Sequence, residues 1–465
     1  MRLCHHVGIL GLVALGCGDN LAPPDEVPPD FIGQLRALPG VHDVEEQPTQ
    51  TPNVRYYVLH FDQPVDHADP QSPHFLEKVS LLHKDPAKPL IVWTSGYWDY
   101  YLDHPVELTT LLDGNQISIE HRYFGESRPD PADWSKLTID QMAADEHAIV
   151  SALRTLYTGK ALASGGSKGG MTAMFFRRFY PDDVDGTVPY VAPISFGAPD
   201  TRYSPFLDTV GNDACRQAVR DVAVEMLANR RAAITQAAQD QAVAMNLSYT
   251  RILLAPAVES AIFSIEWSFW QYFGITYCSK VPLTTATDAD MFKFLDDVSP
   301  VSDNSDARIG EFDAYYYQAY FQLGYPDDGG TYLQSYLMYT DADYLSALPT
   351  AEPAYDGGVA MMDIDQFVRE SGERLLFIYG EWDPWTAGKF ELGNATDSLR
   401  LIQAQGTHGS HITRLADVDR DAALAKLAAW TGVTPVLPKQ RVADVRVPRL
   451  PPAMSRALRV RRLSP

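Results

Sequence analysis

Short apolar runs alternate with longer helical patterns over the first 200 residues. Residues 54–68 alternate apolar and polar side chains, which is typical of a half-buried strand. Further strands are predicted at 78–84, 89–96, 116–122 and 160–164. Apolar side chains at helical spacing predict helices within 140–157 and 168–180. Strands that alternate with helices predict a parallel sheet with helices on both of its faces.

This alternation stops near residue 200. From about 201 to 360 the chain is helical and aromatic, and strand patterns return at 374–380 and 398–404. A last helix is predicted within 419–432. The order predicts one α/β core that is interrupted by a helical insertion.

The first 17 residues have the pattern of an export signal. A basic start precedes an apolar run of about ten residues, too short to span a bilayer, and then Cys17. The end of this run resembles a bacterial lipoprotein signal, although Ala14 stands where such signals usually carry Leu. We expect export, with a lipid anchor on Cys17 favoured over free secretion.

The whole chain is therefore expected to have six parts. They are an export signal (1–17), an acidic, proline-rich tether (18–47), the first part of the core (48–200), a helical lid (201–360), the second part of the core (361–432) and an arginine- and proline-rich tail (433–465). The tail either lies on the acidic protein surface or is a free basic extension.

Charge and cysteine content limit which partners and which compartment are expected for the protein. A net charge of −22 argues against nucleic acid and anionic membrane surfaces as partners, so membrane contact is expected only through Cys17. The sequence does not specify an oligomeric state. After export and lipidation, Cys215 and Cys278 remain, and they either form a disulfide or are two separate buried thiols.

The segment 163–171, ASGGSKGGM, is the strongest chemical signal. Gly165-x-Ser167-x-Gly169 between a predicted strand and helix fits a nucleophile elbow, in which glycines leave room around a serine on a tight turn. The absence of the GxxxxGK[ST] pattern argues against a phosphate loop.

Two later loops supply the partners that a serine nucleophile needs. Asp383 follows the predicted strand 374–380, and His408 and His411 follow the strand 398–404. The order Ser, Asp, His matches an α/β-hydrolase triad, and the tighter glycine frame favours His408 over His411. No metal site and no cofactor are expected, because the HxxH spacing lacks the glutamate of an HExxH motif and there is no cysteine cluster.

An oxyanion hole requires two N–H donors. We expect the backbone N–H of Lys168, next to the nucleophile, and that of Tyr97, in the loop after the strand 89–96. The side chain of Lys168 receives no role.

Six segments together resemble the bacterial secreted tripeptidyl aminopeptidases, also described as prolyl tri- and tetrapeptidyl aminopeptidases, distant relatives of lysosomal Pro-X carboxypeptidase and dipeptidyl peptidase II. They are SGYW (95–98), IEHRYFGES (119–127), GGSKGGM (165–171), YPDDVDGTVPYVAP (180–193), GEWDPW (380–385) and GTHG (406–409). The resemblance extends from about residue 50 to 430. It implies an α/β-hydrolase core with a helical lid, a triad of Ser167, Asp383 and His408, and release of tri- or tetrapeptides from free N-termini, often at proline.

An aminopeptidase must also bind the substrate ammonium group. Glu120, at the end of a predicted strand, is one candidate, with a structural ion pair to Arg122 as the alternative. Trp98 and Trp385 are further substrate-binding candidates. Aromatic lid residues either stack on proline rings or serve ordinary packing: Trp267, Trp270, Tyr272, Phe273, Tyr315, Tyr316 and Tyr317. The competing functions are an esterase or lipase on the same core and a non-catalytic surface lipoprotein.

Overall fold

The computed structural model describes residues 30–100, 103–327, 329–340, 343–344, 348–350 and 353–438. The expected export signal with Cys17 and the first part of the tether lie outside these residues, as does the tail from residue 439 onward.

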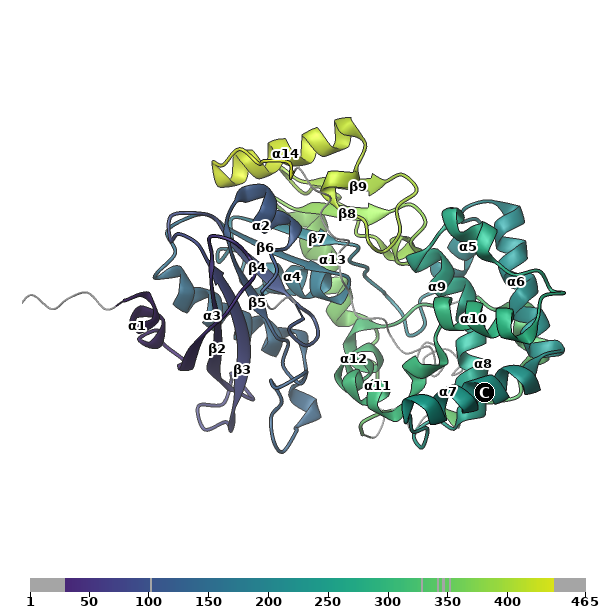
Figure 1. The fold of residues 1–465 in the computed structure, drawn as a ribbon. Coiled ribbons are helices and arrows are strands. Elements are labelled where there is room, and N and C mark those ends of the chain that lie inside the picture. Colours follow the sequence, from purple (N-terminus) through teal and green to yellow (C-terminus); the bar gives the residue numbers. More distant parts are fainter. Residues whose placement is uncertain are drawn as a thin grey trace, which may run out of the picture.

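A nine-stranded sheet forms the centre of the core (Figure 1). Its order is β1-β2-β3-β5-β4-β6-β7-β8-β9. The strands are β1 (Val41–Gln47), β2 (Arg55–Pro64), β3 (His74–His83), β4 (Leu90–Thr94), β5 (Asn115–Ile119), β6 (Ala161–Gly166), β7 (Gly186–Tyr190), β8 (Leu376–Gly380) and β9 (Leu399–Gln403).

The expectation of a parallel sheet is correct for only part of it. The neighbours from β5 through β4, β6, β7 and β8 to β9 are parallel. β1, β2 and β3 pair antiparallel, and β3 is antiparallel to β5. The connections at 48–54 and 65–73 contain no helix and are too short for the crossover that parallel neighbours need.

The expected tether at 18–47 is wrong for residues 30–47. Residues Phe31–Arg36 form helix α1, and the next segment is the edge strand β1. Leu35 and Val44 are buried, and the Phe31 ring stacks on His83 with centroids 3.7 Å apart. Burial of these apolar side chains fixes a segment whose charged composition suggested an extended chain.

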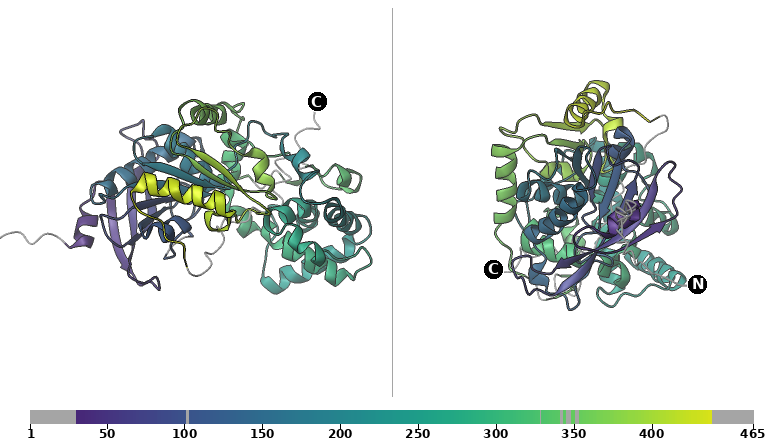
Figure 2. Two further views of the ribbon diagram at one scale, coloured as in Figure 1. Left: turned by 90° about the horizontal axis from the view of Figure 1, so that it is seen from above. Right: turned by 90° about the vertical axis from the view of Figure 1, so that its left-hand side faces the viewer.

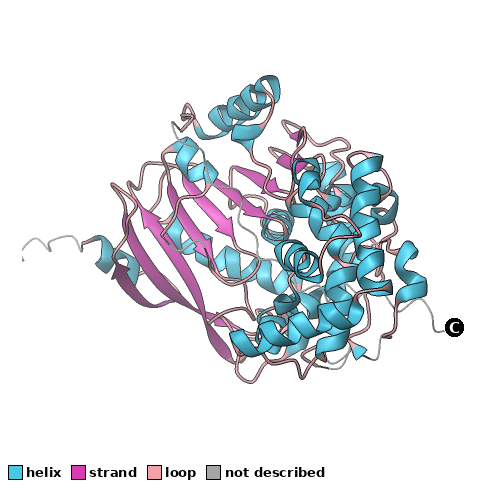
Figure 3. Cartoon of the chain, turned by 45° about the vertical axis from the view of Figure 1, so that its right-hand side comes forward, coloured by secondary structure: helices cyan, strands magenta, loops and turns pink. Residues whose placement is uncertain are grey.

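Helices cover both faces of the sheet (Figures 2 and 3). α3 (Ile139–Arg154), α4 (Lys168–Phe179) and α13 (Val359–Ser371) pack on one face. α2 (Glu107–Leu112) and α14 (Asp417–Thr431) pack on the other. α4 carries the glycine-rich segment and lies directly behind β6, so the Ser167 turn is held between two buried elements.

A block of helices fills the chain between β7 and α13, beside the core in teal and green in Figure 1. Its α-helices are α5 (Tyr203–Leu207), α6 (Asp213–Ala228), α7 (Arg231–Met245), α8 (Leu254–Phe263), α9 (Ile265–Tyr272), α10 (Asp288–Val298), α11 (Asp306–Glu311) and α12 (Asp313–Gln318). One aromatic cluster extends from this block to Tyr97, Trp382 and Trp385 of the core. We call the block the lid.

The described residues also contain short 3-10 and π segments. They are η1 (Trp134–Lys136), η2 (Ile275–Lys280), η3 (Val301–Asn304), η4 (Ala319–Leu323), η5 (Thr331–Tyr336), η8 (Pro384–Gly388) and η9 (Ile412–Arg414). A disulfide between Cys215 and Cys278, with Cα atoms 5.6 Å apart, joins α6 to η2 inside the lid. None of the helices in the described ranges has the length and apolar content that crossing a membrane requires.

Candidate active site

Ser167 occupies the sharp turn between β6 and α4. Its backbone has φ 55° and ψ −123°, a positive φ that is costly for a residue with a side chain. Its N–H donates to the Tyr190 carbonyl at 2.8 Å, and its carbonyl accepts from Met171 at 3.0 Å. The neighbouring strand and the new helix therefore hold the serine in a conformation it would not adopt alone.

The glycines beside Ser167 provide clearance, as predicted. A Cβ on Gly165 would overlap the backbone of Gly169, and one on Gly169 would overlap the Thr94 carbonyl oxygen. Thr94 ends β4, so the strand, the turn and the helix approach as closely as backbone atoms allow.

Asp383 and His408 meet at the same edge of the sheet. Asp383 follows β8, and one of its carboxylate oxygens, Oδ1, accepts from the Trp385 N–H at 3.1 Å. Its other oxygen, Oδ2, lies 2.6 Å from His408 Nδ1, and both side chains are buried. Because β6, β8 and β9 run parallel, their carboxyl ends place Ser167, Asp383 and His408 at one edge.

The second ring nitrogen of His408 is unused. Nε2 is buried and has no hydrogen-bond partner among the described residues. With Nδ1 held by Asp383, the neutral ring carries its proton on Nδ1 and presents Nε2 as a base.

The lid contacts His408 directly. The His408 N–H donates to the carbonyl of Gln271, in α9, at 2.8 Å. The ring of Tyr272 lies edge-on to the imidazole with centroids 6.3 Å apart, and Trp385 lies on another side at 6.4 Å. Trp267 packs against Trp385 with centroids 5.1 Å apart. Two of the predicted lid aromatics thus surround the site, and the Gln271 contact had no signal in the sequence.

His411 has a different environment. Its Nδ1 lies 2.9 Å from Glu107 Oε1, in α2, and Glu107 also accepts from the Ile412 and Thr413 N–H groups and the Tyr190 hydroxyl. Burial by itself would raise the pKa of Glu107, but the hydrogen bonds from His411 and Thr413 lower it. This cluster fastens the loop that carries His408 to the core.

The two expected oxyanion donors lie on adjacent backbones. Lys168 is the first residue of α4, where N–H groups are not used within the helix. The Tyr97 N–H donates to Ser95 Oγ at a long distance of 3.4 Å, and the one proton of that hydroxyl can go to the carbonyl of Tyr97 or to that of Ile119. The two backbone segments are in close contact, since a Cβ on Gly96 would overlap the Lys168 carbonyl carbon and the Gly169 nitrogen.

Glu120 lines a cavity of about 560 Å³ between the core and the lid, together with Trp98 and Asp99. Its carboxylate already accepts from the N–H groups of Asp99, Glu126 and Ser127 and from the Ser127 hydroxyl. Burial raises the pKa of the neighbouring Asp99 to about 6. The carboxylate of Glu120 thus holds the loop 120–127 in place.

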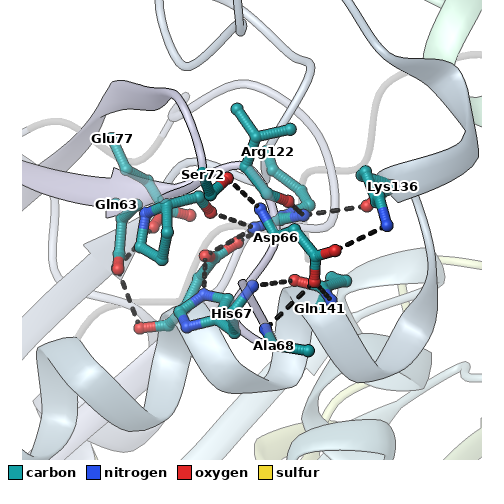
Figure 4. Close-up of polar contacts among 12 residues, drawn as sticks. Gln63, Asp66, His67, Ala68, Ser72, Glu77, Arg122, Lys136 and Gln141 are labelled. Carbon is teal, nitrogen blue, oxygen red and sulfur yellow. Dashed lines mark hydrogen bonds and ion pairs between the residues drawn. The ribbon is translucent and has the colours of Figure 1, made fainter. Parts of the chain in front are cut away.

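The alternative of an ion pair between Glu120 and Arg122 is wrong. Arg122 is fully buried and donates to both carboxylate oxygens of Asp145, at 2.5 and 2.8 Å. Its remaining N–H groups donate to the Pro64, Val65 and Lys136 carbonyls (Figure 4). Arg122 therefore connects the loop after β5 to the end of β2 and to α3. The two residues have different partners because Glu120 accepts from backbone N–H groups of residues 99, 126 and 127, whereas the Arg122 guanidinium pairs with Asp145 in α3.

No group of three or more His, Cys, Asp or Glu side chains in the described ranges is arranged to hold a metal ion.

A mostly parallel sheet with a serine on a strand-to-helix turn, and an aspartate and a histidine after later strands, defines an α/β-hydrolase. Residues 25–449 match the family model described as PS-10 peptidase S37, so the chain belongs to that family and is a serine peptidase.

Relatives agree with this membership. The chain is 39% identical over 434 residues to prolyl tri/tetrapeptidyl aminopeptidase of Streptomyces mobaraensis, covering 92% of this chain and 90% of the relative. It is 30% identical over 219 residues to lysosomal Pro-X carboxypeptidase of Mus musculus, covering 41% of each.

The solved structures that match the chain have low sequence identity to it. A proline iminopeptidase from Mycobacterium smegmatis has a TM-score of 0.36 and 15% identity, covering 83% of this chain and all of that one. A peroxisomal alpha-beta-hydrolase from Saccharomyces cerevisiae has a TM-score of 0.37 and 10% identity, covering 84% of this chain and 94% of that one.

Proposed function

We propose that this chain is a serine exopeptidase that releases tri- or tetrapeptides from the free N-terminus of peptides, favouring proline at the cleaved bond. The observation that carries the proposal is the 39% identity to the Streptomyces aminopeptidase over 92% of the chain. The pairing of His408 with Asp383 and the strained turn at Ser167 support it.

In the proposed mechanism, Ser167 Oγ attacks the carbonyl carbon of the scissile bond while His408 Nε2 accepts the hydroxyl proton. Asp383 keeps the imidazole oriented and stabilises its charged form. The tetrahedral oxyanion accepts hydrogen bonds from the Lys168 and Tyr97 N–H groups. His408 then donates its proton to the leaving amine, and the C–N bond breaks to give an acyl-enzyme. Water, deprotonated by His408, hydrolyses this ester and restores Ser167.

The lid supports an exopeptidase that acts on extended peptides. α9 contacts His408 through Gln271 and Tyr272, so helical structure covers the imidazole. A covered site admits a chain terminus more readily than a loop of a folded protein. The rings of Trp267 and Trp385 form an apolar wall on which a proline ring can pack.

A comparison of three substrates tests the proposal. We expect wild-type protein to cleave an Ala-Ala-Pro arylamide with a free N-terminus and to cleave the N-blocked arylamide poorly. S167A should lose this activity and its labelling by a fluorophosphonate probe while keeping its melting temperature. Cleavage of a short nitrophenyl ester without any arylamide cleavage would instead support an esterase. Absence of a probe adduct on folded wild-type protein would support a non-catalytic binding protein.

Three residues are proposed to contact the substrate: Glu120, Trp98 and Trp385. Trp98 lines the cavity at the lid, Trp385 lies beside His408, and Glu120 lines the same cavity as Trp98. If Glu120 binds the substrate ammonium, E120Q should raise KM for the free arylamide and leave KM for the blocked one unchanged. An equal effect on both substrates, with a lower melting temperature, would leave Glu120 only its role in the loop.

We also propose that the protein is exported and held at the cell envelope by a lipid on Cys17. The support is the sequence pattern of residues 1–17. Expression of the full chain in a bacterial host, with and without C17S, tests it. The chain with Cys17 should partition into detergent and carry an acylated N-terminal cysteine. Release of both this chain and the C17S variant into the medium would indicate free secretion.

A further inference from the structure

The side chain of Lys168 is buried at the entrance to α4, and the proposed mechanism uses only its backbone. It is 2% exposed. Its Nζ donates to the Gly96 carbonyl at 2.5 Å and lies over the rings of Phe124 and Tyr97, 5.0 and 5.4 Å from their centroids. Thus the residue after the nucleophile reaches back to the loop that follows β4.

Burial of the Lys168 ammonium in this position lowers the stability of the folded protein. Among the described residues Lys168 forms no ion pair with a carboxylate. Burial lowers the pKa of the Lys168 ammonium well below its usual value, and the charge of Glu146 acts in the opposite direction. A buried amine that is held by one carbonyl and two ring faces costs more stability than an apolar side chain of the same length would. Such a cost points to a gain elsewhere.

The carbonyl that Lys168 binds belongs to the peptide unit that carries the Tyr97 N–H. In a trans peptide the C=O and the N–H point in opposite directions, so fixing the Gly96 oxygen fixes the direction of the Tyr97 N–H. Gly96 has φ +72°, and a Cβ there would overlap the backbone of Gly169. A glycine with a positive φ allows the adjoining peptide unit to rotate, so this donor needs an external hold.

The other end of Tyr97 is also held. Its carbonyl accepts from the His121 N–H at 2.9 Å and from Ser95 Oγ at 2.7 Å. The hydrogen bond from the Lys168 ammonium determines the direction of the Gly96 carbonyl, at the other end of the peptide unit. One residue thereby supplies one oxyanion donor through its backbone and orients the other through its side chain.

We propose that Lys168 is a positioning residue: its ammonium, through the Gly96 carbonyl, holds the Tyr97 N–H toward the oxyanion. This inference rests on the proposed function. The geometry assigns the lysine of the GGSKGG segment to transition-state stabilisation, with no direct contact to the substrate.

The variant K168M tests the inference, because it keeps the length of the side chain and removes the donor. Loss of a whole oxyanion donor lowers kcat by about 10²–10³-fold. K168M should leave the Tyr97 N–H in place but wrongly directed. We therefore expect it to lower kcat for the free Ala-Ala-Pro arylamide by about tenfold to a hundredfold with little change in KM. The control is T172A, which removes the hydroxyl that donates to the Lys168 carbonyl at 2.9 Å and leaves Gly96 untouched.

Two inhibitors separate positioning from general damage. A tripeptidyl trifluoromethyl ketone forms an oxyanion on Ser167, whereas a peptide with a methylene in place of the scissile carbonyl cannot. K168M should weaken the ketone by about the same factor as kcat and bind the methylene analogue like wild type. K168Q, which keeps an N–H donor, should retain more kcat than K168M, and it serves for the same comparison if K168M does not fold.

Equal losses for both inhibitors, or unchanged kcat in K168M, would overturn the inference and leave the proposed function standing. If the wild-type protein itself does not cleave the arylamide, the proposed function fails, and the role of Lys168 fails with it.

Discussion

His411 Nδ1 lies 2.9 Å from Glu107 Oε1, across 304 residues of sequence. The two histidines of the GTHGSH loop therefore have separate tasks: His408 faces Asp383, and His411 ties the loop to α2.

Substitution of each histidine should separate these tasks. We expect H408A to lower kcat by about 10⁴-fold or more without a large change in melting temperature. H411A should remove one of the several hydrogen bonds to the buried Glu107 carboxylate and lower the free energy of unfolding by about 1–3 kcal/mol. Steady-state kinetics and thermal unfolding of both variants check this, and a greater loss of kcat in H411A would reverse the assignment.

A methyl group at Gly169 should be poorly tolerated. Its Cβ would overlap the carbonyl oxygen of Thr94, and a strand backbone in the centre of the sheet cannot move aside. We expect G169A to lower the free energy of unfolding by about 3 kcal/mol and to reduce kcat, since the Ser167 turn would shift. At Gly310, in α11, the nearest atom to a Cβ is 3.6 Å away, so G310A should be neutral. A G169A variant as stable as G310A would contradict the clearance argument.

The buried carboxyl of Glu77 should make stability depend on pH. Burial and the charge of Asp145 raise its pKa well above the usual 4.5, and Gln63 donates to it at 3.0 Å. The folded protein therefore keeps this proton to higher pH than the unfolded chain does, and its contribution to stability falls as pH rises above about 4.5.

Accordingly, E77Q should gain stability relative to wild type by up to about 1.4 kcal/mol per pH unit in that window. Urea unfolding at pH 4 to 8 measures it, with E45Q on the exposed face of β1 as the control. Parallel pH profiles for wild type and E77Q would show that Glu77 titrates normally.

Reduction of the Cys215–Cys278 bridge should destabilise the lid. The bridge closes a loop of 63 residues, for which the chain-entropy model gives about 4 kcal/mol. The double variant C215A/C278A should unfold at a lower temperature and lose activity earlier on heating than the β-sheet loses its circular dichroism. Identical melting curves for the variant and wild type would show that the bridge contributes nothing to stability.

Much of the core could be predicted because its signals are local. β4 and β8 are continuous apolar runs, β5, β6 and β9 contain shorter apolar stretches, and each of the five was expected within three residues of its observed bounds. β7, with the sequence GTVPY, was missed because Gly186 and Pro189 weaken its strand pattern, and β1 was missed because an edge strand can be polar.

The candidate site was predictable only where chain order determines proximity. Ser167, Asp383 and His408 each follow a strand, and parallel strands bring those loops together. The partners of Glu107, Arg122 and Lys168 follow from packing between segments that are distant in sequence or from side-chain direction, neither of which leaves a periodic pattern. Hence the ion pair of Glu120 with Arg122 was a plausible reading and a wrong one.

The hydrogen bond from the His408 N–H to the Gln271 carbonyl makes selectivity and reactivity a single property. In the proposed mechanism, a substrate bulky enough to displace α9 would also break this hydrogen bond and move the imidazole. An oversized substrate would therefore inactivate the enzyme as it binds. Selection by substrate size would then need no separate gate, because His408 is correctly placed as a base only when α9 covers it.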